Sequence, residues 1–321
     1  MKVLITPGLT LPEVSEPDLE RIRAAAGEDA EVVVVDPAAL MEHAAEMDVV
    51  LGFVPRKVFR SAPRLAWVHA IASGVDAFLY DEFVASDVVL TSEKGLVGEH
   101  LADHAFALLL TLTRQVKSAL AYGAESWNHR PEMRRQEIEL TGSTMGIWGF
   151  GGTGRAMARR AAAFGMSVQA VDRDPVPPSA EVAFVHGVEF FDELLRTSDV
   201  VAVCVPLTRE TRSQFDARAF SLMRPNAWLV NVTRGEVMVE EDLVAALQEG
   251  RIRGAAMDVA PREPLPADSP LWSLPNVVMT PHTAGASQFR AARNIDRFVG
   301  NLERFRRGEP LEGMIDKRLG Y

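Results

Sequence analysis

Residues 144–154 read TMGIWGFGGTG, an apolar stretch that runs directly into the glycine pattern G-x-G-x-x-G. An alanine-rich segment follows from Arg155 to Phe164 and is typical of a helix, and the next β-branched run, Ser167–Val171, ends at Asp172. A strand, a glycine turn, a helix and a second strand, in this order, are the context in which the pattern binds a dinucleotide. The segment therefore predicts a Rossmann unit that begins near residue 144.

The glycines of this turn have separate tasks. Gly149 permits the tight turn, Gly151 lets the backbone approach a pyrophosphate, and Gly154 lets the helix pack closely on the strand. The backbone N–H groups of Gly152 and Thr153 stand at the start of the predicted helix, where they would face the phosphates. A glycine-rich turn alone is common in proteins, so the surrounding pattern is what favours a cofactor site.

Asp172 predicts which cofactor is used. A carboxylate at the end of the second strand accepts hydrogen bonds from the adenosine ribose hydroxyls, although an aspartate here could also simply cap a turn. Because this carboxylate repels a 2′-phosphate, it favours NAD over NADP. Arg173 follows directly and could hold that phosphate by swinging in, which keeps NADP possible.

Further strand-like runs alternate with segments of helical length along the chain, which predicts parallel sheets built from βαβ units. Several runs are apolar without alternation, as expected for strands covered by helices on both faces. We expect an α/β protein with two doubly wound parallel sheets. The other strand-like runs are Lys2–Ile5, Val32–Val35, Val49–Val54, Leu65–Ile71, Val88–Thr91, Val200–Val205, Ala227–Val232, Ala255–Val259 and Val277–Thr280.

Two features divide the chain. Residues Gly98–Tyr122 are expected to form one long helix, and the polar, strand-poor stretch Gly123–Glu139 leads to the strand at Thr144. The Arg-rich segment Ala286–Arg307 reads as a helix that returns to cover the first unit. We therefore expect a flavodoxin-like substrate domain made of residues 1–98 plus 286–321, into which a dinucleotide-binding Rossmann domain of residues 99–285 is inserted.

Composition narrows the class of partner. The 321 residues carry a net charge of −10, which argues against nucleic-acid or anionic-membrane surfaces as partners, because both attract basic patches. No apolar run is long enough to span a bilayer or to form a signal-peptide core. The single cysteine, Cys204, fits a reducing compartment and lies in an apolar strand, where we expect it to be core. A cytoplasmic protein is expected.

Three polar islands follow strands of the second unit: residues 231–235 (NVTRG), 258–265 (DVAPREPL) and 276–285 (NVVMTPHTAG). In an open parallel sheet, residues beyond the carboxyl ends of the strands converge on the cofactor crevice. Arg234, Glu263 and His282 can therefore meet although they are far apart in sequence. Taken singly, each has a structural alternative: a solvated glutamate, a turn-closing arginine or a histidine at a strand end.

With these islands in order, the chain resembles the D-isomer-specific 2-hydroxyacid dehydrogenase family, and in particular its glyoxylate/hydroxypyruvate-reductase-like members. The resemblance runs from residues 73–76 (SGVD) to Gly285. It includes residues 139–142 (ELTG) before the glycine turn and residues 205–212 (VPLTRETR). It implies hydride transfer between nicotinamide C4 and C2 of a small 2-oxo or 2-hydroxy acid.

The resemblance also assigns roles. His282 would be the general acid/base, with Glu263 on its other ring nitrogen to fix the tautomer. Arg234 would hold the substrate carboxylate, since a guanidinium is planar and always charged. Backbone amides of Ser73 and Gly74 would bind the same carboxylate.

Further cofactor contacts are expected from residues that the resemblance places beside the dinucleotide. Asp258 would contact the nicotinamide carboxamide, and Thr211 and Thr233 would line the site. His282 would also touch the cofactor, together with three residues of the matching loops: Val205, Pro206 and Ala284. Family members usually pair through the cofactor domain, so a homodimer is expected.

Two other functions compete with this assignment. His100 and His104 stand one helical turn apart, a spacing able to bind a metal, but the zinc-protease pattern wants Glu where Leu101 stands. Corepressor proteins of the same fold use it as an NAD-sensing scaffold and carry the same three catalytic residue types. Within the family, formate dehydrogenases carry an amide where Glu263 stands, and long phosphoglycerate dehydrogenases need a regulatory domain for which no residues remain.

Overall fold

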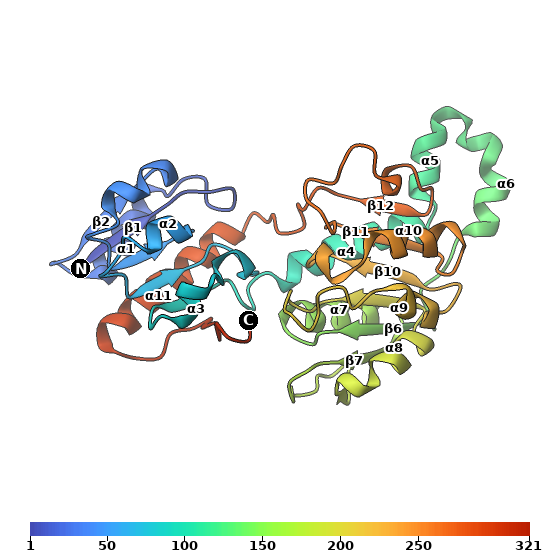
Figure 1. Ribbon diagram of the computed structural model, residues 1–321. Helices are drawn as coiled ribbons and strands as arrows, with labels where there is room; N and C mark the ends of the chain where they lie inside the picture. The colour runs from blue at the N-terminus through green and yellow to red at the C-terminus, as the bar shows by residue number, and fades with distance from the viewer. The chain divides into compact units, whose positions relative to one another are not determined.

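Short apolar segments build two parallel β-sheets, one in each of two units of the chain (Figure 1). The structure is a computed structural model that describes residues 1–321. Unit 1 comprises Met1–Val97 together with Ala286–Tyr321, and unit 2 comprises Gly98–Gly285. The chain therefore passes between the units twice, once at residues 97–98 and once at residues 285–286.

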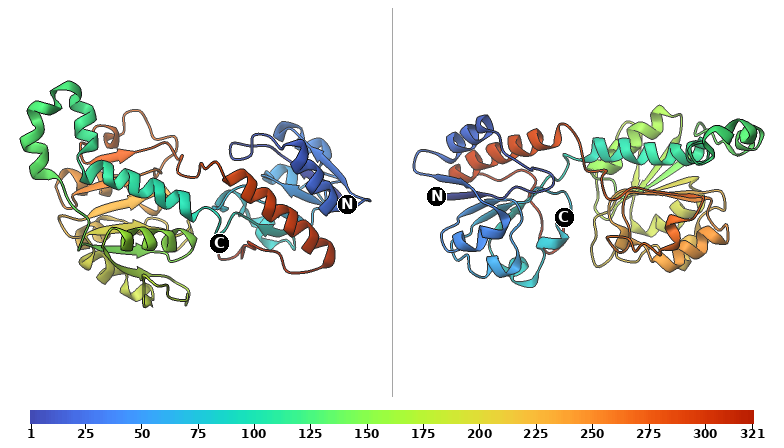
Figure 2. Two further views of the ribbon diagram at one scale, coloured as in Figure 1. Left: turned by 180° about the vertical axis from the view of Figure 1, so that it is seen from behind. Right: turned by 90° about the horizontal axis from the view of Figure 1, so that it is seen from above.

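Unit 1 is a five-stranded parallel sheet with the strand order β2-β1-β3-β4-β5. Along the strand Lys2–Ile5, successive side chains face opposite sides of the sheet: Val3 and Ile5 pack in one apolar layer and Leu4 packs in the other. Helices α1 (Glu16–Ala26) and α11 (Arg290–Arg307) cover the first face and lie side by side in Figure 2. The second face is covered by shorter helical segments. The strands are β1 (Lys2–Ile5), β2 (Glu31–Val34), β3 (Val49–Leu51), β4 (Trp67–His69) and β5 (Val89–Thr91), and the shorter segments are η1 (Pro37–His43), α2 (Arg56–Phe59), η2 (Asp76–Phe78) and α3 (Asp81–Ala85).

Unit 2 is a seven-stranded parallel sheet with the order β12-β11-β10-β9-β6-β7-β8. Helices α4 (Gly98–Thr113) and α7 (Gly152–Ala163) pack together on one face, and α8 (Phe191–Thr197), α9 (Ala217–Leu222) and α10 (Glu240–Gln248) cover the other. The strands are β6 (Thr144–Trp148), β7 (Ser167–Val171), β8 (Val185–His186), β9 (Val200–Val203), β10 (Trp228–Asn231), β11 (Gly254–Met257) and β12 (Val277–Met279). The predicted α/β class with two parallel sheets is confirmed.

Several sequence predictions of local structure are wrong. The single helix expected over Gly98–Tyr122 ends at Thr113, because Gln115 takes a left-handed conformation (φ 54°), and α5 (Val116–Tyr122) starts anew. The polar stretch after it contains a helix, α6 (Ser126–Gln136), which its low hydrophobicity concealed. The two-residue strand β8 was too short to give a pattern. The last helix begins at Arg290 rather than at residue 286.

Helices α5 and α6 form an arm that reaches away from the sheet of unit 2 (Figure 1). Neither helix contains a buried residue, and the side chains of Leu120 and Trp127 are both 76% exposed. Lys117 fastens the base of the arm, because its Nζ donates to the carbonyl oxygens of Leu274 (2.7 Å) and Val277 (2.5 Å). Helices this short are marginal in water without tertiary packing.

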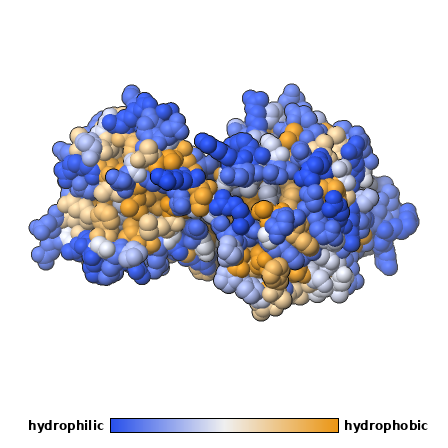
Figure 3. All heavy atoms as spheres, turned by 60° about the horizontal axis from the view of Figure 1, so that its bottom comes forward, coloured by the Kyte–Doolittle hydropathy of each residue, from blue (hydrophilic) through white to orange (hydrophobic).

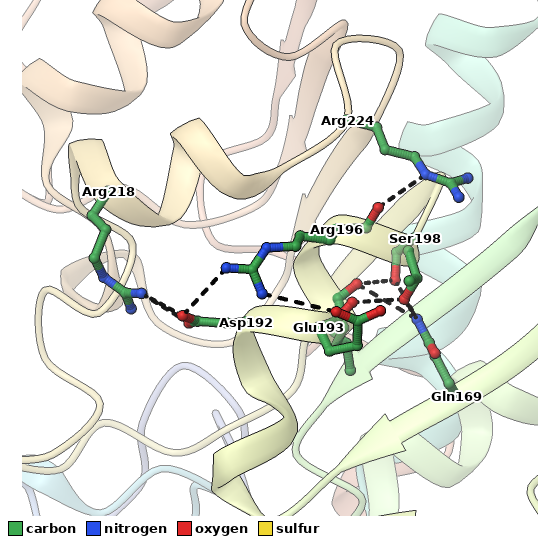
Figure 4. A network of polar contacts seen from close by, with 9 residues as sticks. Gln169, Asp192, Glu193, Arg196, Ser198, Arg218 and Arg224 are labelled. Carbon is green, nitrogen blue, oxygen red and sulfur yellow. Dashed lines mark hydrogen bonds and ion pairs between the residues drawn. The ribbon is translucent and has the colours of Figure 1, made fainter.

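Unit 2 carries a polar network around α8 (Figure 4). Gln169 on β7 donates to the hydroxyls of Thr197 (2.7 Å) and Ser198 (3.0 Å), which fixes the end of α8 on the sheet. The ion pair of Arg218 with Asp192 (2.8 Å) lies in solvent, where the arginine side chain is 54% exposed. Exposed pairs of this kind contribute little to stability.

On the face shown in Figure 3, hydrophilic residues surround patches of hydrophobic ones. Such patches are normal on folded proteins. None of the helices has both the length and the apolarity needed to cross a membrane.

Unit 1 contains a buried ion pair near its junction with unit 2. Glu93, 1% exposed, accepts hydrogen bonds at both oxygens from Nε of Arg290 (3.1 and 3.0 Å) and one from Asn294 Nδ2 (2.9 Å). Its backbone N–H donates to the Ala72 carbonyl (3.2 Å). This ion pair joins the segment before α4 to the start of α11, so it ties together the two chain segments that leave unit 1.

We predict that Arg290→Ala lowers the free energy of unfolding of unit 1 by about 3–5 kcal/mol, because it leaves a buried carboxylate without its counter-charge. Urea denaturation measures the change. The matched control is Arg218→Ala on the surface, expected to cost less than about 1 kcal/mol. The double variant Glu93→Gln/Arg290→Met should recover much of the loss, and equal effects of Arg290→Ala and Arg218→Ala would contradict the assignment.

Candidate active site

The glycine turn after β6 stands where the strand order of unit 2 reverses, between β9 on one side and β7 on the other. Ligands of open α/β sheets bind at this point. Gly149 has φ +95°, and a Cβ on it would lie 2.7 Å from the backbone carbon of Cys204. A Cβ on Gly154 would lie 2.1 Å from the Gly149 oxygen, whereas a Cβ on Gly151 would meet nothing within 4 Å. The first and last glycines are thus needed for packing, and Gly151 borders open space.

Helix α7 begins in that open space. Gly152 and Thr153 form its first turn, and Gly151 and Gly152 are exposed. The first amides of a helix have no acceptor within the helix and carry the positive end of its dipole. A pyrophosphate fits this exposed helix start, with the side-chain-free Gly151 beside it.

Asp172 ties the end of β7 to the glycine turn. Its Oδ2 accepts from the Phe150 backbone N–H (2.6 Å) and its Oδ1 from the Asp174 N–H (3.0 Å). The guanidinium of Arg155 stacks on the Phe150 ring (4.7 Å) and donates to the Pro178 carbonyl (3.3 Å), a second link between the two loops. Arg173 is exposed and stands 3.4 Å from Asp174 Oδ1.

The loop after β9 borders the other side of the turn. A Cβ on Gly149 would lie 2.8 Å from the Val205 nitrogen, so the two loops touch. Thr211 closes this loop, because its hydroxyl donates to the Pro206 carbonyl (2.7 Å) and accepts from the Thr208 N–H (2.8 Å). Val205, Pro206 and Thr211 therefore lie along the carboxyl edge of the sheet beside the glycine turn.

Arg234 follows β10 and is placed by a residue to which sequence analysis gave no role. Asn231, fully buried at the end of β10, donates through Nδ2 to the Arg234 carbonyl (2.8 Å). Its Oδ1 accepts from the N–H (3.0 Å) and the hydroxyl (3.2 Å) of Thr233. The Arg234 guanidinium donates from Nη1 to the Thr233 carbonyl (2.8 Å). The feature of the sequence that could have pointed to Asn231 is its place as an asparagine at the end of a buried strand.

Close backbone approach brings the Arg234 loop against the loop after β11. A Cβ on Gly235 would lie only 1.9 Å from the carbonyl carbon of Ala260, so no other residue fits there. The Ala260 N–H in turn donates to Glu263 Oε1 (3.0 Å). Arg234 and Glu263 therefore belong to two loops in direct contact.

Glu263 and His282 form a hydrogen-bonded pair with 2.8 Å between Oε2 and Nδ1. Because a carboxylate can only accept, Nδ1 carries the hydrogen and Nε2 is left as the atom that exchanges a proton. The His282 side chain is 43% exposed, so this atom has access to solvent or a ligand.

The His282 backbone is held by Asp258, whose side chain is 1% exposed. His282 has φ +55°, a conformation that is unfavourable for a residue with a Cβ. Its N–H donates to the Asp258 carbonyl (2.8 Å), and the next two N–H groups, of Thr283 and Ala284, donate to the Asp258 carboxylate (2.9 and 2.8 Å). Asp258 is thus a loop-organising residue, and its contact with a nicotinamide stays a prediction.

The remaining predicted residues lie elsewhere. Ser73 and Gly74 belong to unit 1, in the half-buried loop between β4 and η2. His104 is one of the two histidines with metal-binding spacing. Its Nε2 forms a hydrogen bond with the Thr280 hydroxyl (2.8 Å). Cys204 packs against the apolar layer under α4 and α7, and burial raises the pKa of its thiol to about 12.

We predict that Gly151→Ala weakens NADH binding at least ~10-fold, because the new methyl group would occupy the space beside the start of α7. The free energy of unfolding should change by less than about 1 kcal/mol, since nothing lies within 4 Å. The control Gly154→Ala should instead destabilise the fold by about 1–3 kcal/mol. Fluorescence titration and urea denaturation measure both quantities, and unchanged NADH affinity in Gly151→Ala would contradict the site.

Known proteins resemble this chain over most of its length. A sequence model described as "D-isomer specific 2-hydroxyacid dehydrogenase, NAD binding domain" matches residues 106–284. The glyoxylate reductase of Korarchaeum cryptofilum is 35% identical over 274 residues, which cover 83% of this chain and 80% of that protein.

Solved structures agree. The NADPH-dependent glyoxylate/hydroxypyruvate reductase from Sinorhizobium meliloti, in complex with NADP and sulfate, superposes with a TM-score of 0.80 at 28% identity and full coverage of both chains. The NAD-dependent formate dehydrogenase from Staphylococcus aureus, in complex with NAD, gives a TM-score of 0.76 at 27% identity over 98% of this chain and 99% of that one.

The sequence and structural matches confirm the predicted enzyme class, an NAD(P)-dependent oxidoreductase. The chain belongs to the D-isomer specific 2-hydroxyacid dehydrogenase family.

Proposed function

We propose that the protein reduces a small 2-oxo acid of the glyoxylate type with a reduced nicotinamide cofactor, and that His282 is the acid that completes the reaction. The observation that carries the proposal is the 2.8 Å hydrogen bond between His282 Nδ1 and Glu263 Oε2. It leaves Nε2 as the proton donor on a loop beside the cofactor sheet's carboxyl edge. The glyoxylate reductase relatives support the substrate class.

A reduced nicotinamide cofactor, when bound, would supply the hydride that C2 of the oxo acid receives. His282 Nε2 donates a proton to the carbonyl oxygen as the C–H bond forms, so the carbonyl becomes a hydroxyl and the imidazolium becomes neutral. Glu263 accepts the Nδ1 hydrogen throughout, which fixes the tautomer and the orientation of the ring. The half-exposed ring then regains a proton from water, and oxidation of the hydroxy acid follows the same steps in reverse.

Arg234 binds the substrate carboxylate in this proposal. Its guanidinium offers parallel donors that match the two oxygens of a carboxylate. Asn231 and Gly235 fix the backbone on both sides of Arg234, which limits where the fork can reach. The backbone amides of Ser73 and Gly74 in unit 1 are proposed to bind the same carboxylate.

NAD is the proposed cofactor in preference to NADP. Asp172 holds a negative charge at the end of β7, where a 2′-phosphate would lie, and that charge is fixed in place by two backbone N–H groups. Asp174 also forms an ion pair with the neighbouring Arg173, with 3.4 Å between Oδ1 and Nε. The Sinorhizobium meliloti relative is described as NADPH-dependent. We therefore infer that local charges of this kind decide between NAD and NADP within the family.

We predict that Arg234→Ala lowers kcat/KM for glyoxylate by at least ~100-fold while the NADH dissociation constant stays within about threefold, because the proposal gives the guanidinium a contact with the acid and none with the cofactor. His282→Gln should lower kcat by ~10²–10⁴-fold and abolish the limb of the pH profile that belongs to the imidazole. Steady-state kinetics with glyoxylate, hydroxypyruvate, pyruvate and bulkier 2-oxo acids, each with NADH and NADPH, measure these quantities.

The surface variant Arg218→Ala is the control and should match the parent enzyme. Normal kinetics in Arg234→Ala combined with lost NADH affinity would contradict the role given to Arg234. An unchanged pH profile in His282→Gln would contradict the role given to His282. A higher kcat/KM with NADPH than with NADH would contradict the role given to Asp172.

A homodimer is also proposed, formed through the α5–α6 arm of unit 2. The arm exposes Leu120 and Trp127 and buries none of its own residues, so its helices need a partner surface to be stable. Two copies of the same arm supply one, and closed two-fold pairing is the commonest assembly of soluble proteins. We also propose a cytoplasmic location, which the single free cysteine, Cys204, fits.

Light scattering should give the mass of a dimer for the parent chain and that of a monomer for the double variant Leu120→Glu/Trp127→Glu, because two charges cannot be buried across the arm. The circular dichroism spectrum should show that units 1 and 2 stay folded. A parent chain that elutes as a monomer at micromolar concentration would rule the dimer out.

A further inference from the structure

His104 lies on α4 (Gly98–Thr113), and the reaction proposed above assigns it no role. Its Nε2 stands 2.8 Å from the Thr280 hydroxyl oxygen, and that oxygen stands 2.6 Å from Asp258 Oδ1. The direct distance from Nε2 to the same carboxylate oxygen is 3.5 Å. An imidazole, a hydroxyl and a buried carboxylate therefore form a continuous chain from α4 to the carboxyl end of β11.

The direction of the hydrogens in this chain follows from the groups themselves. The Asp258 carboxylate only accepts, so the single hydrogen of the Thr280 hydroxyl points to it. The hydroxyl oxygen then accepts from His104, which means that Nε2 carries a hydrogen. This nitrogen is consequently a donor in the chain of hydrogen bonds, and only Nδ1 of the neutral ring keeps a lone pair.

The other side of Asp258 holds the loop that carries His282. Its carboxylate accepts from the N–H groups of Thr283 and Ala284, and its carbonyl accepts from the N–H of His282. The left-handed backbone at His282 is unfavourable for a residue with a Cβ and persists only because its surroundings hold it. Because these three hydrogen bonds join Asp258 to consecutive residues of the turn, the position of Asp258 sets the position of the His282 backbone.

We propose that His104 is a positioning residue for His282, acting through Thr280 and Asp258. Its N–H restrains the Thr280 hydroxyl, the hydroxyl fixes the rotamer of the Asp258 carboxylate, and the carboxylate fixes the strained turn that aims His282. This inference rests on the proposed role of His282 as the acid. It assigns to α4, whose main task is to cover the sheet, a second task in catalysis.

His104→Ala tests the proposal in single-turnover reduction of glyoxylate by NADH. We expect the rate of hydride transfer to fall ~10–100-fold, because a misplaced reacting group costs this much, while the NADH dissociation constant changes by less than about threefold. His104→Gln keeps an N–H donor at nearly the same place as Nε2 and should regain a rate within about threefold of the parent. His43→Ala, in η1 of unit 1, is the matched histidine control.

A second pair of variants separates positioning from a loss of stability. Thr280→Val removes the hydroxyl at constant shape and should slow hydride transfer as much as His104→Ala does. The double variant His104→Ala/Thr280→Val should be no slower than Thr280→Val alone, because both changes break the same chain. Urea denaturation of each variant checks that the fold is intact.

Two results would overturn the inference while the proposed function stands: a His104→Ala rate within twofold of the parent, or a His104→Gln rate no better than that of His104→Ala, each with His282→Gln inactive. Multiplicative losses in the double variant would also overturn it. Retained activity in His282→Gln would instead refute the proposed function, and with it the positioning role.

Discussion

The buried carboxylate of Asp258 is the interaction on which the candidate site depends. It lies at the end of β11 with 1% of its side chain exposed, and a charge in such a place must be matched by donors. Its donors are the Thr280 hydroxyl and the backbone N–H groups of Thr283 and Ala284. Satisfying this one charge therefore forces the chain after β12 into the turn that carries His282.

The parallel sheet of unit 2 does the rest of the assembly. Strands β6, β9, β10, β11 and β12 all deliver their carboxyl ends to one edge, so the loops that follow them meet there. Contact between neighbouring loops needs residues without side chains, which explains the very close approaches at Gly149 and Gly235. Asn231 and Asp258 fix the positions of these loops, because the two buried polar side chains form hydrogen bonds with the loop backbone.

Sequence patterns predicted the two-sheet α/β fold and the glycine turn because strand, turn and helix signals there are local. The order of the polar islands indicated only that Glu263 and His282 can meet, and their pairing, 2.8 Å apart, was implied by the family resemblance. The break at Gln115 could not be predicted, since it is a left-handed residue without glycine, and α6 escaped because its exposed polar sequence has no apolar face. The chain from His104 to Asp258 was hidden as well, because it links α4 to β12 across the sequence and depends on side-chain geometry.

A crystal structure with NAD and an unreactive 2-oxo acid analogue such as oxamate tests the central claim most directly, namely that Asp258 holds His282 ready to transfer a proton. The prediction is that His282 keeps its positive φ and its hydrogen bond to Glu263, that its Nε2 lies within hydrogen-bond distance of the analogue's carbonyl oxygen, and that Arg234 contacts the carboxylate. An imidazole that points away from the carbonyl oxygen, or a loop released from Asp258, would contradict it.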